Sequence, residues 1–148
     1  MRKITYLLLV LYTCSCVPAK IVKPYNSKTI CVSTQADGRQ VVKAWGQGTN
    51  YANALEDAKA NAINDIIFKG IYDGDPKCNK IPLVPEVNAR TKYENYFNGF
   101  FSNGGSYNNF VTVFGRFYKR SIAEGVTLEI DVPKLKQQLI NDGILKAQ

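Results

Sequence analysis

Residues 41–71, "VVKAWGQGTNYANALEDAKANAINDIIFKGI", contain the pattern that decides the fold. A β-rich run meets two glycines, and a long alanine-rich segment follows. Apolar residues in that segment recur at three- and four-residue spacing, which predicts an amphipathic helix over 51–69. The polar pair Thr49-Asn50 offers a cap at its start, and Gly70 suits a left-handed residue at its end. The many alanines keep the helix slim, so that it can lie close against a sheet.

Two pairs of β-rich segments flank this helix. Turn-forming residues separate the members of each pair, which predicts two hairpins. The last strand alternates strictly between apolar and polar residues, as expected where one face of a sheet is buried. A short second helix begins near Pro133 and ends before Gly143. The predicted strands are 28–34, 40–45, 110–120 and 126–132, with turns at Asp37-Gly38 and 123–125.

The order of these elements predicts an α+β fold for residues 28–148, taken as a single domain. We expect an antiparallel sheet in β-β-α-(insert)-β-β-α order, with the helices packed on one face. The insert covers about 71–109. Within it, 71–92 looks irregular, 93–101 favours a short helix, and 102–109 is typical of a turn or loop.

The insert contains the most unusual stretch of the chain, "YENYFNGFFSNGGSYNNF" at 93–110. Tyrosine and asparagine on an exposed loop make a plausible binding surface, because tyrosine provides a large and rigid contact area. The alternative is that the aromatic residues fill the core. We expect the phenylalanines to be core residues and the tyrosines to lie at the surface. The candidate core residues are Phe97, Phe100 and Phe101, and the candidate binding residues are Tyr93, Tyr96, Tyr107 and Asn108.

The start of the chain has the layout of an export signal. Residues 1–3 include two basic side chains, and residues 4–12 form a nearly uninterrupted apolar run. That run is about half as long as a membrane-spanning helix. A short apolar run after a basic start is typical of a secretory signal peptide.

Two cysteines follow this run and compete as a lipidation site. The arrangement resembles a bacterial lipobox, in which the cysteine thiol is acylated and becomes the new N-terminus. Cys16 is preferred because the small Ser15 precedes it, and Cys14, with a leucine three residues upstream, is the alternative. The sequence therefore predicts a signal peptide over 1–15 and a tether over 16–27.

The expected location is the outer membrane, with the domain anchored by lipid and facing the periplasm. The tether has no acidic cluster of the kind that some Bacteroidota lipoproteins carry as a surface-export signal. Its prolines and lysines are typical of an extended linker beside anionic headgroups. More than one acyl chain is needed for a stable anchor, so the membrane itself is the first expected partner.

Two more cysteines, Cys31 and Cys78, remain for the mature domain. An even pair in an oxidising compartment suggests one disulfide. The alternative is two free buried thiols, which behave as small apolar side chains.

The composition excludes several kinds of chemistry. The chain has no histidine, which removes serine–histidine and cysteine–histidine nucleophile pairs and the usual zinc ligand sets. The remaining carboxylates of interest, Asp73, Asp75, Glu86 and Glu94, lie in segments that already favour solvated turns. The 19 basic residues are scattered rather than gathered in the stripe that nucleic acid requires. We therefore expect no enzyme activity, no cofactor or metal and no nucleic-acid partner.

The strand–glycine–helix stretch resembles the central motif of the LPP20 family of small bacterial lipoproteins. Trp45, two glycines and alanines at four-residue steps occupy the matching positions. Residues 125–139, "GVTLEIDVPKLKQQL", resemble the closing strand and helix of that family. The insert departs from this pattern and resembles uncharacterised Bacteroidota envelope proteins.

The resemblance implies a location and a fold but no active site. It favours a non-enzymatic accessory or scaffold with protein partners in a cell-envelope assembly, a secretion apparatus being one setting. The alternative function is a glycan- or peptide-binding module that uses the Tyr/Asn-rich insert.

Overall fold

The computed structural model describes residues 28–120 and 123–146. The predicted signal peptide, the candidate lipidation residues Cys14 and Cys16, and the tether lie outside the described residues. None of the helices in the described ranges is both long enough and apolar enough to cross a bilayer.

One mixed sheet organises the described residues, and its strand order is β3-β1-β2-β5-β4. Neighbouring strands are antiparallel except β1 and β3, which run parallel. The predicted α+β class and mostly antiparallel sheet are thus confirmed, with one parallel edge pair added. The strands are β1 (Ile30–Thr34), β2 (Gln40–Gln47), β3 (Asp73–Gly74), β4 (Val111–Arg120) and β5 (Ala123–Ile130).

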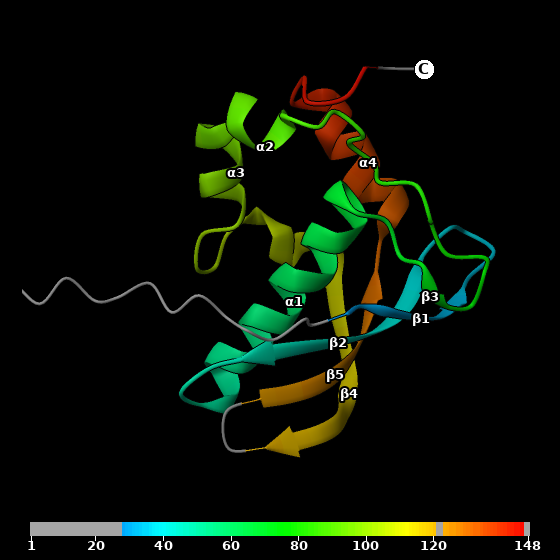
Figure 1. Ribbon diagram of the computed structural model, residues 1–148, viewed down its shortest axis with the longest axis vertical. Coiled ribbons are helices and arrows are strands. Elements are labelled where there is room, and N and C mark those ends of the chain that lie inside the picture. The colour runs from blue at the N-terminus through cyan, green and yellow to red at the C-terminus, as the bar shows by residue number, and fades with distance from the viewer. Residues whose placement is uncertain (1–27, 121–122, 147–148) are drawn as a thin grey trace, which may run out of the picture.

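Helix α1 (Tyr51–Phe68) lies across β2 and β5 (Figure 1). Its cap is Asn50, whose side chain accepts a hydrogen bond from the backbone N–H of Asn53. Gly70 follows the helix with a φ of +79°, the left-handed conformation that the sequence predicted there. The helix approaches β2 so closely that a Cβ added to Gly46 would overlap the backbone of Ala54 and Ala58.

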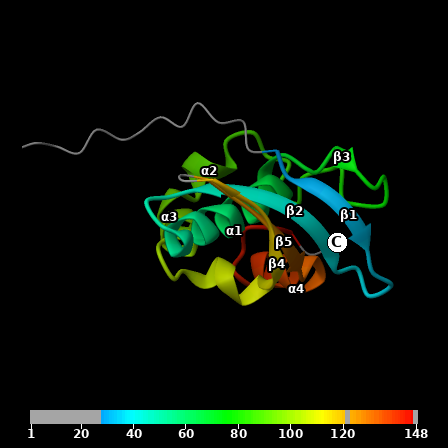
Figure 2. The ribbon, with the colours of Figure 1, turned by 90° about the horizontal axis from the view of Figure 1, so that it is seen from below.

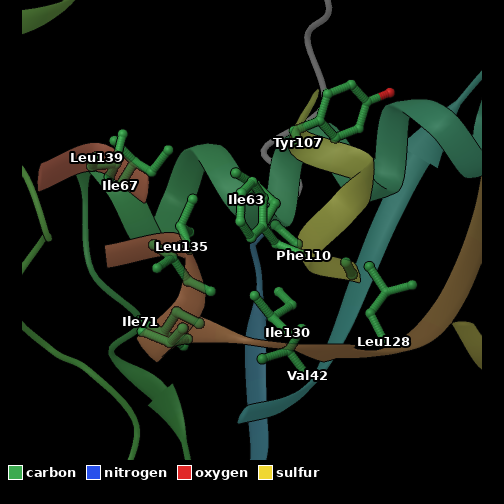
Figure 3. Close-up of a cluster of buried hydrophobic side chains, with 14 of the residues drawn as sticks. Val42, Ile63, Ile67, Ile71, Tyr107, Phe110, Leu128, Ile130, Leu135 and Leu139 are labelled. Atoms are coloured by element: carbon green, nitrogen blue, oxygen red, sulfur yellow. The ribbon is translucent and has the colours of Figure 1, made fainter. Parts of the chain in front are cut away.

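The remaining helices are short. The last of them, α4, lies on the same side of the sheet as α1 (Figure 2). Its Leu135 and Leu139 are fully buried and join the core that β2, β5 and α1 form. Figure 3 shows these leucines beside Ile67 and Ile71. The short elements are α2 (Ala89–Lys92), α3 (Glu94–Phe100), α4 (Val132–Asn141) and a 3-10 helix, η1 (Ser106–Phe110).

The prediction of a turn at 123–125 is wrong. These residues belong to β5, where Ala123 pairs with Gln47 of β2 and with Arg120 of β4. Strands on both sides are long enough to supply hydrogen-bonding partners, so the ladder continues past the expected turn.

The insert is more regular than its sequence indicates. Segment 71–92, predicted to be irregular, contains β3 and α2, and the loop predicted at 102–109 is replaced from Ser106 onward by η1. Strand β3 forms because it can pair with the edge of β1. The 3-10 helix forms because Tyr107 and Phe110 both reach the core, at 2% and 4% exposure.

Candidate functional site

The predicted binding residues Tyr107 and Asn108 form hydrogen bonds within the domain, both to Glu56. The Tyr107 hydroxyl donates to Oε2 of Glu56 on α1 at 2.7 Å, and the Asn108 side-chain amide donates to the same oxygen at 3.0 Å. Figure 3 shows the Tyr107 hydroxyl directed away from the other labelled side chains, which are apolar. The expectation that Tyr107 lies at the surface is therefore wrong, because its ring fills the space between η1 and α1.

Glu56 is the polar centre of this contact. Lys59 also reaches it, with 2.7 Å between Nζ and Oε1. Partial burial by itself raises the pKa of the Glu56 carboxyl, but the hydrogen bonds from Lys59, Tyr107 and Asn108 outweigh burial and hold that pKa below its ordinary value. Burial and the Glu56 carboxylate together raise the pKa of Tyr107 to about 12. The cluster therefore keeps a charged Glu56 and a neutral Tyr107 near neutral pH.

The other two candidate tyrosines are half-buried at the outer side of the insert. The Tyr96 hydroxyl donates to Oδ2 of Asp142, just after α4, at 2.7 Å. Burial raises the pKa of the Tyr96 hydroxyl, and the neighbouring Asp142 carboxylate raises it further. The Tyr93 ring lies under Lys92, with Nζ 5.0 Å from the ring centroid. Tyr93 and Tyr96 line one hollow and Tyr107 lines another, so the structure does not bring the three tyrosines together in one pocket.

A hollow of about 320 Å³ lies beside Glu56, between the start of α1 and the insert. Its floor includes Asp57, whose Oδ2 accepts from the backbone N–H of Gln47 at 2.8 Å and from the Asn61 amide at 3.2 Å. Amide and carboxylate groups beside aromatic rings can hydrogen-bond hydroxyl groups and stack on apolar faces. We call this the Glu56 hollow, and its lining residues are Gln47, Asn53, Glu56, Asp57, Ala60, Phe101, Asn103 and Tyr107.

The four carboxylates considered for catalysis are spread over separate contacts. Asp73 pairs with Lys28 at 3.3 Å, and Glu86 pairs with Lys92 at 3.0 Å. Asp75 accepts from the backbone N–H of Lys77. Glu94 borders a hollow of about 360 Å³ whose lining does not include Glu86. Within residues 28–120 and 123–146, no three potential metal ligands of the His, Cys, Asp and Glu types gather at one point.

The sheet has an open face, on the side away from α1. Val42 and Ala44 of β2 are fully buried against the helix, so Lys43 and Trp45, which alternate with them along the strand, point the other way. Trp45 meets Phe117 of β4 edge to face, with ring centroids 5.2 Å apart. Lys43 lies over the same Phe117 ring at 5.2 Å from the centroid.

The sequence pattern did not indicate this open sheet face. Phe117 of this face is 40% exposed, and Phe114, also on β4, is 58% exposed. Irregular register along β4 hides the alternation that would have assigned these residues to a face. The alternation of Lys43 and Trp45 with buried β2 residues was the available signal.

None of the family models, curated proteins or solved structures with which the chain was compared matches it. The resemblance to the LPP20 family is therefore carried by the two sequence stretches at 41–71 and 125–139, and membership stays a prediction.

Proposed function

We propose that this protein is an envelope lipoprotein that acts, without catalysis, as an accessory or scaffold in a cell-envelope assembly. The anchor is Cys16, with Cys14 as the alternative, and the domain faces the periplasm from the outer membrane. The strand–helix motif that resembles the LPP20 family belongs to the same proposal.

The observation that carries the proposal is the disulfide between Cys31 and Cys78. Their Cα atoms are 6.1 Å apart and the sulfurs are bonded. Both residues are buried, at 3% and 4% exposure. Such bonds persist in the periplasm and outside the cell and are rare in the reducing cytosol. The bond therefore supports the export that the first sixteen residues predict independently.

The open sheet face supports the accessory role. Trp45 is half-buried and meets the exposed Phe117 on this face. Accessible aromatic side chains on one face are typical of protein–protein contact surfaces. Lys43 adds a cation beside Trp45 and Phe117. The partner that fits this face is a protein surface with apolar side chains and a carboxylate opposite Lys43.

The test has two measurements on protein extracted from membranes. Intact mass reports whether a cysteine near the start is acylated and whether Cys31 and Cys78 are oxidised. Co-purification after cross-linking then compares the wild type with a Trp45→Ala/Phe117→Ala variant. We expect the variant to lose its membrane-protein partners, while Val87→Ala, at a position that is 97% exposed, keeps them. Equal recovery of partners in all three proteins would contradict the role of the sheet face.

A second candidate function is glycan or peptide binding at the Glu56 hollow. The observation that favours it is that Asn53, Asn103 and the aromatic Phe101 line one hollow. Titration with soluble cell-wall fragments should give a heat signal in wild type that Asn53→Ala and Asn103→Ala both reduce. A wild type that gives no heat with any fragment or peptide removes this candidate.

A further inference from the structure

A second apolar and basic surface lies at the end of the domain where the described chain begins. Tyr72 is 70% exposed and Ile81 is 75% exposed. The segments that carry them run side by side, because the backbone N–H of Ile71 donates to the carbonyl oxygen of Asn79 at 2.8 Å. Gly70 allows the two segments to approach this closely, since any Cβ there would overlap the carbonyl oxygen of Lys80.

Three lysines accompany the exposed Tyr72 and Ile81 side chains. Lys28 and Lys69 border the same cavity as Tyr72, which has a volume of about 240 Å³. Their side chains are 67% and 65% exposed. Lys80 is also exposed and directly precedes Ile81. We call the five residues Lys28, Lys69, Tyr72, Lys80 and Ile81 the Tyr72 surface.

The two carboxylates beside this surface, Asp65 and Asp73, are each paired with a lysine. The buried Asp65 carboxylate accepts from the Thr29 hydroxyl at 2.6 Å and pairs with Lys69 at 2.8 Å. Asp73 pairs with Lys28. Lys69 is held by a fixed carboxylate at its head and still keeps most of its side chain in solvent, so its position is defined before any ligand arrives.

We propose that the Tyr72 surface docks on the bilayer that holds the lipid anchor, with anionic headgroups contacting its lysines. The inference rests on the proposed function, because it needs the anchor. Lys28 is the first described residue, and a tether over 16–27 spans at most about 40 Å when fully extended. Of the surfaces of the domain, the one beside Lys28 is therefore closest along the chain to the predicted anchor.

The chemistry of the surface fits an interface between water and lipid. Tyrosine is enriched at the headgroup level of membrane proteins, and lysine stems lie along apolar surface while their heads reach water or phosphate. The exposed Ile81 side chain adds apolar contact with the acyl boundary. Attraction between a few lysines and anionic lipid is weak alone, but a short tether holds the surface at a high effective concentration.

The experiment places a single tryptophan at the surface of the acylated protein. In a Trp45→Phe background, Tyr72→Trp is compared with Tyr51→Trp after reconstitution into phosphatidylethanolamine/phosphatidylglycerol vesicles that contain brominated lipid. Tyr51 is also exposed, at 40%, and begins the 18-residue α1, which places it about 27 Å from the other end of the helix. We expect bromine to quench the tryptophan at position 72 at least about threefold more than the one at 51, because only position 72 reaches the interface.

A second comparison tests the charges and the apolar contact. Adding Lys28→Gln, Lys80→Gln and Ile81→Ser should reduce quenching at position 72 to the level seen at 51. The matched control adds Lys136→Gln, Lys146→Gln and Phe114→Ser, which removes the same number of charges and apolar side chains elsewhere, and should leave quenching unchanged.

The outcomes separate the two proposals. Equal quenching at positions 72 and 51 in acylated protein overturns the docking surface and leaves the anchor intact. A product whose intact mass shows no acyl chain overturns the anchor and, with it, the docking surface. Loss of quenching in the control variant overturns the assignment to these five residues.

Discussion

Replacing Gly46 with alanine tests the contact on which the fold depends. The added Cβ would overlap the carbonyl oxygen of Ala54 and the backbone nitrogen of Ala58, and would lie 2.9 Å from the Ala58 Cα. All three are backbone atoms of α1, so no side-chain rotation can relieve the overlap. The helix must move away from β2, which loosens the alanine contacts along its whole buried side.

Overpacking of a well-packed core typically costs about 1–3 kcal/mol in the free energy of unfolding. We expect Gly46→Ala to reach the upper end, about 3 kcal/mol, because the obstructing atoms belong to a rigid helix. Gly115 of β4 provides the matched control, since a Cβ there would meet nothing within 4 Å. Gly115→Ala should change the unfolding free energy by no more than about 0.5 kcal/mol.

The assay is equilibrium urea unfolding with the disulfide intact, followed by far-UV circular dichroism and by Trp45 fluorescence. Gly46→Ala should lower the transition midpoint while the slope stays that of the wild type, because the surface exposed on unfolding hardly changes. If Gly46→Ala and Gly115→Ala share the wild-type midpoint, α1 does not lie against β2 as described and the reasoning fails.

Three further predictions concern the disulfide, the buried tyrosine and the helix cap. Replacing Cys31 and Cys78 by alanine together should cost about 4 kcal/mol by loop entropy for a separation of 47 residues, measured by urea unfolding, and an unchanged midpoint would contradict this. Tyr107→Phe should cost about 1.5–3 kcal/mol through the lost bond to the Glu56 carboxylate. The pKa of Tyr107 is raised from 10.0 to about 12 in the folded state, so its stabilisation is complete below pH 10 and is lost as the pH rises through 12. The phenylalanine variant should lack that alkaline loss, and identical alkaline profiles would count against the assignment. Asn50→Ala should cost about 1 kcal/mol by removing the bond to the Asn53 amide, and thermal unfolding without a shift would refute the capping role.

The candidate site around Tyr107 was only partly predictable from the sequence. The pattern of 93–110 indicated that aromatic residues would serve as core, and Phe97 and Phe100 are indeed 2% and 3% exposed. The assignment of Tyr107 to the surface failed because tyrosine has an apolar ring and one polar atom. A partner such as Glu56, 51 residues away in the chain, allows the whole ring to be buried. No pattern in the local sequence predicts that Glu56 is the partner.

Short-range patterns predicted the longer helix and most of the strands of this protein, because helix periodicity, alternation and caps depend on neighbours within a few residues. The cap at Thr49-Asn50, the left-handed Gly70 and the buried face of Val126, Leu128 and Ile130 could be predicted for this reason, although the strand ends at Ile130 and not at 132.

Only the tertiary structure decided where β3 pairs, how far β5 extends and that Trp45 lies on an uncovered sheet face with Phe117. Each depends on a partner strand brought close by the packing of α1, and the free energy of such long-range contacts is not written in any local pattern.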